Sequence, residues 1–174
     1  MALTYVAIAT VTVGSGGAAN IEFTSIPATY TDLQILASVR SDRNEAQDEV
    51  DITFNSNTSN YSSRNLNGSG SGTGSQSNLG ATNRIRTVYI NAATNTSNTF
   101  SSVSIYIPNY AGSNNKSVSI DVVQENNDTF ANATLLAGLW SNTAAITSIM
   151  LDAGLGTNLV QYSTATLYGI KNTV

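Results

Sequence analysis

The sequence contains neither cysteine nor histidine among its 174 residues, and each absence excludes a class of chemistry. Without cysteine, the chain cannot form disulfides or hold a metal through thiolates. Without histidine, it lacks the side chain most often used for acid–base catalysis near neutral pH, and the base of a Ser-His-Asp triad. We therefore expect a protein that is not an enzyme and that carries no cofactor.

Charged residues are also scarce. They make up 10% of the chain, with seven Lys and Arg, eleven Asp and Glu and a formal net charge of −4. Binding to nucleic acid requires clustered basic residues, and the densest basic pair here is Arg84 and Arg86. We expect no direct contact with nucleic acid. The abundant Ser, Thr, Asn and Gly predict a neutral surface, typical of proteins that work outside the cytoplasm and meet protein surfaces or sugars.

Long apolar runs are missing as well. No stretch reaches the roughly 18 apolar residues that would span a bilayer, so no membrane association is expected. The first basic residue is Arg40, and Thr4, Thr10 and Thr12 interrupt the apolar opening of the chain, unlike a signal peptide. The predicted surface thus resembles that of an exported protein, whereas an export signal is not evident.

Apolar and polar residues alternate with a period of two along much of the chain, and no segment shows sustained helical periodicity. Leu36 is the one exception within the clearest predicted strands, which are residues 19–23, 33–39, 50–54, 103–107 and 118–122. Weaker strands have apolar residues on both faces, as expected where a neighbouring subunit covers the second face. They are residues 3–13, 84–90, 130–140, 145–151 and 159–170, and for 131–140 a short helix is the alternative.

Polar turns rich in Gly, Asn and Ser separate these segments, and Pro108 ends one of them. The pattern predicts an all-β fold, an antiparallel β-sandwich that is jelly-roll-like, formed by a single domain over residues 1–174. A long Asn-, Ser- and Gly-rich loop is expected at about residues 55–83. Tyr61, Arg64 and Leu66 indicate a short strand inside that loop as the alternative.

The segment 40–51 holds seven of the eighteen charged residues of the chain. A calcium site formed by Asp42, Glu45 and Asp48 is one hypothesis, although the spacing fits no EF-hand loop. A glycosidase carboxylate pair is another. The interpretation that we favour is a solvated loop between two strands, in which Arg40 and Arg43 pair with neighbouring acids.

Several large side chains are candidates for contacts with other molecules. Tyr61 and Tyr110 are candidate ligand contacts, because aromatic rings bind sugars by stacking, and Tyr110 lies in a predicted turn that should expose it. Tyr106 is expected to point outward. A second group consists of candidate interface residues. It includes Trp140, because a tryptophan lies more often in a core or an interface than it serves as a platform for a ligand. That group is Leu3, Tyr5, Val11, Trp140 and Tyr168.

Five stretches of the chain carry a resemblance to a known family: Met1–Tyr5, Val13–Phe23, Ser25–Leu33, Phe100–Gly112 and Gln161–Ile170. They resemble virion structural proteins of tailed bacteriophages, especially those that infect aquatic bacteria. The resemblance implies a capsid decoration (cement) protein or a tail-fibre module, families that are often β-sandwiches in trimers. The implied partners of a decoration protein are the major capsid protein and further copies of the chain, on the capsid exterior.

Phage assembly would also explain an exported type of surface without an export signal, since virions assemble in the host cytoplasm and leave by lysis. The alternative that the resemblance leaves open is a tail-associated module that recognises host surface glycan through Tyr61 and Tyr110. A soluble carbohydrate-binding domain of a cellular protein is a third hypothesis. The resemblance provides no catalytic motif.

Overall fold

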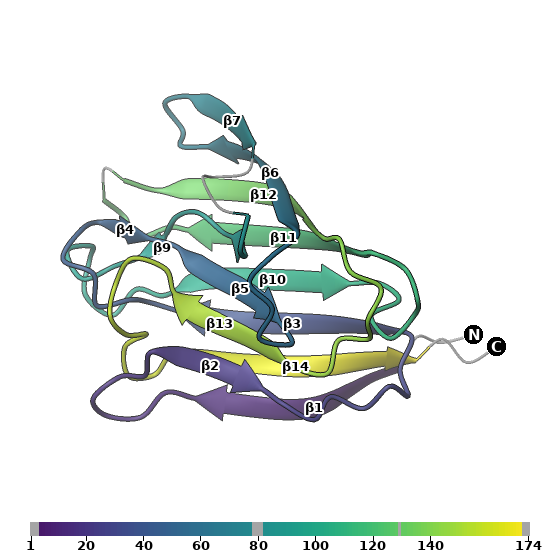
Figure 1. Cartoon of the computed structure of the whole chain (residues 1–174). Helices are drawn as coiled ribbons and strands as arrows, with labels where there is room; N and C mark the ends of the chain where they lie inside the picture. Colours follow the sequence, from purple (N-terminus) through teal and green to yellow (C-terminus); the bar gives the residue numbers. More distant parts are fainter. Residues whose placement is uncertain (1–3, 78–81, 129, 172–174) are drawn as a thin grey trace.

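The computed structural model describes residues 4–77, 82–128 and 130–171, and within these ranges the chain forms fourteen strands and no helix (Figure 1). All strand pairs are antiparallel, and two sheets pack face to face. The predicted antiparallel β-sandwich is therefore confirmed. The two sheets are unequal in size.

The larger sheet has eight strands in the spatial order β1-β14-β3-β10-β11-β12-β6-β7. Its strands β3, β10 and β11 come from the clearest alternating segments of the sequence. Its members are β1 (Thr4–Thr12), β3 (Asp32–Val39), β6 (Tyr61–Gly68), β7 (Thr73–Ser77), β10 (Ser101–Ile107), β11 (Lys116–Gln124), β12 (Asn132–Trp140) and β14 (Thr164–Lys171).

The smaller sheet, which lies in front of the larger one in Figure 1, has the order β2-β13-β5-β8. These strands are β2 (Asn20–Phe23), β5 (Val50–Phe54), β8 (Ile85–Arg86) and β13 (Ile149–Ala153). A further two-stranded ladder joins β4 (Gln47–Asp48) to β9 (Ile90–Asn91). The chain crosses repeatedly between the sheets, as in β1 to β2 to β3, which gives the fold its jelly-roll-like character.

The core lies between the two sheets because each strand turns its apolar set inward. Ile35, Ile105 and Leu167 of the larger sheet are fully buried, and so are Ile52 and Phe54 of the smaller one. Direct cross-strand pairs such as Ile35 with Ile105 set the register, since a slip of one residue would turn the apolar set to solvent.

The expectation of a long loop in the middle of the chain is corrected. The predicted loop at 55–83 contains the hairpin of β6 and β7, and β6 pairs with β12 along its whole length. The inward residues Ser63 and Asn65 of β6 are buried although they are polar, so backbone pairing rather than apolar alternation forms this strand. The short strand proposed around Tyr61, Arg64 and Leu66 is thereby confirmed.

The helix considered for 131–140 is wrong, because Asn132–Trp140 form β12, which pairs with β11 on one side and with β6 on the other. The predicted strand at 84–90 is shorter than expected. Only Ile85–Arg86 is a strand there, and β9 begins at Ile90. Near Ile85 the sandwich is tight, since a Cβ added to Gly138 of β12 would lie 2.8 Å from an Ile85 methyl carbon.

Candidate functional site

Three aromatic residues that were candidates for external contacts lie inside the fold. Tyr110 is 0% exposed, and its hydroxyl donates a hydrogen bond to the Pro27 carbonyl, so the prediction of an exposed turn residue is wrong. Tyr110 belongs to the loop after β10, and its side chain is buried in the sandwich. A ring in this position anchors the loop and offers no face to a ligand.

Tyr61 and Trp140 are also buried, and their rings stack at 6.1 Å between centroids. The Tyr61 hydroxyl accepts a hydrogen bond from the Phe54 amide at 2.8 Å. Burial raises the pKa of Tyr61 to about 12, with a smaller opposing effect from the hydrogen bond that the Phe54 amide donates. The assignments of Tyr61 to ligand binding and of Trp140 to an interface are therefore corrected, because both residues form an aromatic core cluster.

Two carboxylates of the charged segment 40–51 bind backbone amides. Asp48 accepts the amides of Leu155 and Gly156 at 3.0 and 2.9 Å, and Asp42 accepts those of Thr157 and Asn158 at 2.8 and 2.9 Å. These backbone donors occupy the oxygens that a cation would need. In the described ranges no group of three or more acidic, His or Cys side chains is placed to hold a metal. The two carboxylates instead fix the loop before β14.

The amide donors also affect the ionisation of Asp42. Burial by itself would raise its pKa, but the hydrogen bonds from Asn158 and Thr157 outweigh that effect and lower the pKa below its ordinary value. Glu45, the third residue of the calcium hypothesis, is exposed, and its backbone amide bonds to the Arg43 carbonyl. The loop is thus ordered by carboxylate–amide contacts.

Arg40 and Arg43 do not pair with neighbouring acids as expected. Arg43 donates to the Gln47 carbonyl at 2.9 Å, and Arg40 is buried with its guanidinium on backbone carbonyls. The ion pairs among the described residues join Arg84 to Asp51, and Arg86 to both Glu49 and Asp51. The favoured interpretation as a solvated loop is therefore wrong for Arg40, Asp48 and Asp51, which are buried.

On the outer side of the smaller sheet, Asp51 lies directly opposite Asp152. Burial is the main cause that raises the pKa of each, and the Asp51 carboxylate adds to the effect on Asp152. Arg84 and Arg86 neutralise Asp51, which is 1% exposed. The arrangement buries Asp51 among its partners, where a substrate could not reach it.

The remaining interface candidates lie at one edge of the larger sheet. Tyr5 of β1 is 54% exposed, and its ring meets that of Tyr168 edge-on at 6.4 Å. Val11 is half-buried and packs against the core, whereas Leu3 lies outside the described residues. The structure brings Tyr5 and Tyr168 together on the outer face of the sheet.

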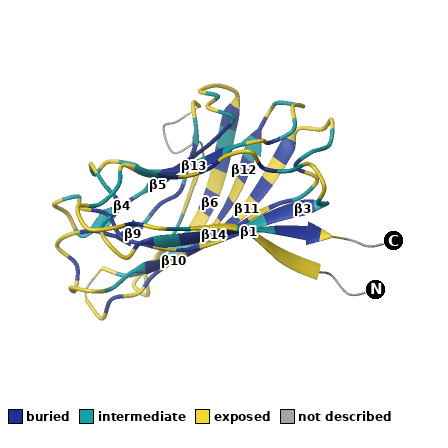
Figure 2. Cartoon of the chain, turned by 90° about the horizontal axis from the view of Figure 1, so that it is seen from below, coloured by how far each residue is buried: buried dark blue, intermediate teal, exposed yellow. Residues whose placement is uncertain are grey.

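Strand β1 is the edge of this sheet, and most of its residues are exposed (Figure 2). One side pairs with β14, and the other side pairs with no strand in the described part of the chain. The sequence Thr-Tyr-Val-Ala-Ile-Ala-Thr-Val-Thr contains no charged residue and no proline, the usual protections of an edge. A bulge between Ala7 and Ala9 is the one protective feature. We call Thr4–Thr12 the edge strand.

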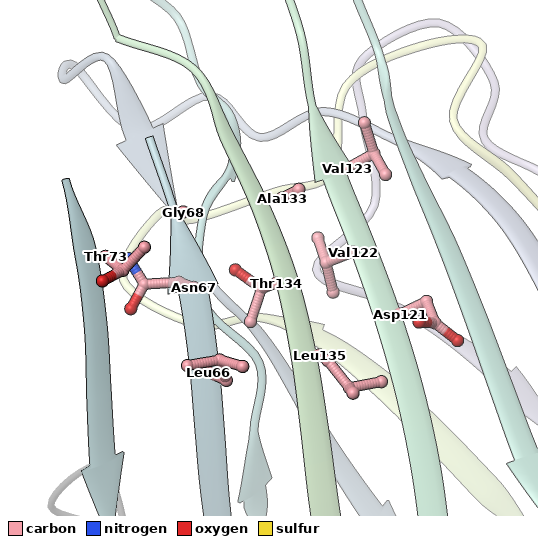
Figure 3. Close-up of a pocket in the computed structure, with 10 residues that line it drawn as sticks. All are labelled: Leu66, Asn67, Gly68, Thr73, Asp121, Val122, Val123, Ala133, Thr134 and Leu135. Atoms are coloured by element: carbon pink, nitrogen blue, oxygen red, sulfur yellow. The ribbon is translucent and has the colours of Figure 1, made fainter. Parts of the chain in front are cut away.

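A second exposed surface lies near the opposite edge of the same sheet. Leu66 of β6 and Leu135 of β12 are direct cross-strand partners, and they are 58% and 53% exposed. Val123 of β11 and Ala133 of β12 continue the surface, and an open pocket of about 340 Å³ lies among these strands (Figure 3). We call Leu66, Val123, Ala133 and Leu135 the outer patch. Asp121 borders it.

The strand β12 explains why the outer patch is apolar. Its inward residues include Leu136 and Trp140, and its outward residues are Ala133, Leu135, Ala137 and Leu139, so both faces lack charge. An exposed apolar patch on a folded protein commonly marks a contact with another molecule. In the sequence, the apolar residues on both faces of 130–140 indicated the β12 part of the outer patch. Leu66 was not indicated, because it lies in a segment that was expected to be a loop.

Comparison with known proteins gives no relative. No family model, curated protein or solved structure matches this chain. Among the described residues no helix is long and apolar enough to cross a membrane.

Proposed function

We propose that this chain is a structural protein of a bacteriophage particle, a decoration protein that stabilises the capsid from outside by contacts with neighbouring subunits. One observation supports the proposal most: the edge strand and the outer patch lie near opposite edges of one sheet, and both are apolar and nearly free of charge. A protein that joins neighbours in a shell needs at least two separate contact surfaces.

The two surfaces suit two kinds of partner. The unpaired backbone of the edge strand fits a further copy of the chain, because antiparallel pairing of two uncharged strands satisfies hydrogen bonds on both. The outer patch fits a flat apolar surface on the shell protein. Specific interfaces bury on the order of 1,600 Å² in total, and repetition over a shell adds avidity to each weak contact.

The particle role can be tested by counting copies. Quantitative mass spectrometry of phage particles, purified from cells that produce this chain, gives its ratio to the shell protein. Hundreds of copies per particle are expected for a decoration protein. A few dozen copies or fewer would instead place the chain in a tail, and its absence from particles would refute the proposal.

A tail-associated module that recognises host glycan remains the second candidate. Its two aromatic contacts from the sequence, Tyr61 and Tyr110, are buried, and so any glycan must bind elsewhere on the surface.

A further inference from the structure

A pocket of about 320 Å³ lies at the end of the sandwich where β10 and β14 begin. Its walls are the loop that leads into β10 and the turn that leads into β14. Both strands begin at the end opposite to Thr4 and Lys171, which pair with each other at the other end of the sheet. We call this cavity the end pocket; it is lined by Arg40, Ser97, Asn98, Phe100, Val160, Gln161 and Tyr162.

Tyr162 is the most exposed large apolar side chain in the described ranges, at 69%. Its φ of 72° lies in the left-handed region, which is costly for a bulky residue and suits glycine. The amide of Tyr162 donates to the Val13 carbonyl at 3.0 Å, and that of Ser163 to the Val160 carbonyl at 3.1 Å. The fold thus holds an aromatic ring in solvent on a strained backbone, and folding alone does not require a ring at this position.

Buried Arg40 joins both walls of the end pocket. Its guanidinium donates to the carbonyls of Thr96 and Thr99 at 2.7 and 3.0 Å in the first wall. Its backbone carbonyl accepts the Val160 amide at 2.9 Å, and its amide donates to the Ser163 hydroxyl at 3.2 Å in the second. Because one residue fixes both walls, the pocket is preorganised, which reduces the entropic cost of binding.

The chemistry of the lining selects a class of ligand. The second guanidinium nitrogen of Arg40 donates to the carbonyls of Ala93 and Asn95, so both terminal nitrogens already bind backbone carbonyls, with which a phosphate or carboxylate would have to compete. The remaining polar groups are the amides of Asn98 and Gln161 and the hydroxyl of Ser97, beside the rings of Phe100 and Tyr162. A wholly apolar ligand would leave those amides without partners.

From this geometry we infer that the end pocket binds a neutral saccharide. A sugar ring has an apolar C–H face that packs on an aromatic ring, and a rim of hydroxyls that bond to amides. The volume lies near the lower limit of ligand pockets, roughly 300–1,000 Å³, and so fits one or two sugar rings. This inference does not depend on the particle role, because none of these residues belongs to the outer patch or the edge strand.

The test uses the full chain on an array of neutral and acidic oligosaccharides, followed by titration calorimetry with the best neutral one. Tyr162→Gly relieves the left-handed backbone, so its thermal midpoint is expected to equal or exceed that of the wild type. Its affinity for the sugar should fall by about tenfold or more. Tyr162→Phe keeps the ring and should bind within a few-fold of the wild type. Tyr5→Ala, which removes an exposed ring at the other end of the sheet, should leave the affinity unchanged.

Three outcomes would overturn the inference. They are the absence of binding to any neutral sugar, binding to acidic sugars alone, or equal affinity of Tyr162→Gly and the wild type. Each of these results would leave the count of copies per particle unaffected, so failure of the sugar site and failure of the particle role are distinguishable.

Discussion

Leu135 of β12 lies directly opposite Leu66 of β6, and both side chains point away from the core on the outer face of the larger sheet. Beyond them in the same row are Asp121 on one side and Ser75 on the other. Two leucines paired in solvent contribute little to folding, because their surfaces stay largely in water. Their placement is explained most simply by a partner that covers them.

Leu135→Asp is therefore expected to reduce incorporation of the chain into particles without unfolding it. An aspartate at the centre of the outer patch would have to be desolvated against an apolar partner, which costs several kcal/mol. Leu36→Asp is the matched control, since Leu36 is 48% exposed in the same row of the same sheet, between Thr166 and Ser104. The measurement is competition between each variant and the wild type for particles, and equal loss in both variants would argue against the outer patch.

The edge strand predicts self-association that one charge can prevent. Ala7 is exposed beside Tyr168, so Ala7→Lys places a cation at the open edge, where natural proteins place charge to block pairing. Light scattering over a concentration series should show oligomers of the wild type and monomers of Ala7→Lys. Ser75→Lys on β7, the other edge of the sheet, should associate like the wild type. A wild-type chain that is monomeric at every concentration would contradict this role of the edge strand.

The Asp51–Asp152 pair predicts a pH-dependent stability. A carboxyl whose pKa is raised in the folded state favours folding when it is protonated. That contribution is complete below the ordinary carboxyl pKa of 3.8 and is lost as the pH rises through the folded-state pKa. Asp152→Asn should therefore stabilise the fold at pH 7, and this gain should shrink as the pH falls toward 3.

Urea unfolding at both pH values measures this difference. Asp121→Asn, at an exposed carboxylate on the outer face, should change the free energy of unfolding little. A destabilised Asp152→Asn at pH 7 would mean that the carboxylate of Asp152 contributes a favourable contact that outweighs its burial.

Replacement of Asp48 is expected to destabilise the fold through lost hydrogen bonds, with no contribution from calcium. In Asp48→Asn, one amide nitrogen would face the Gly156 or Leu155 amide in place of an accepting oxygen, at a cost of roughly 1.5–3 kcal/mol. Glu45→Gln, at an exposed neighbour, is the control and should be nearly neutral. Millimolar calcium should shift the wild-type melting temperature by less than about 1 °C, and a rise of several degrees would restore the metal hypothesis.

Much of the fold could be predicted from the sequence because alternation reports burial directly. Val103, Ile105 and Ile107 turn inward in β10 as their spacing indicates, and the antiparallel sandwich follows from several such segments. The strand β6 was harder to identify, since its inward Ser63 and Asn65 are polar and its position depends on pairing with a strand some 70 residues away.

The candidate site could be predicted only in part. The apolar residues on both faces of 130–140 indicated a covered strand, and they lead to Leu135. The burial of Tyr110 could not be predicted, because it depends on a hydrogen bond to Pro27, which lies 83 residues earlier in the sequence. The end pocket was missed for a related reason, since Arg40 brings together two loops that are about 60 residues apart in sequence.

Hydroxyl-radical footprinting of the free chain and of particles that contain it tests the central claim most directly, because it reports the solvent access of individual side chains. If a partner covers the outer patch, Leu66 and Leu135 should react strongly in the free chain and several-fold more weakly in particles, while Leu36 should change little. Equal reactivity of Leu66 and Leu135 in both samples would contradict it.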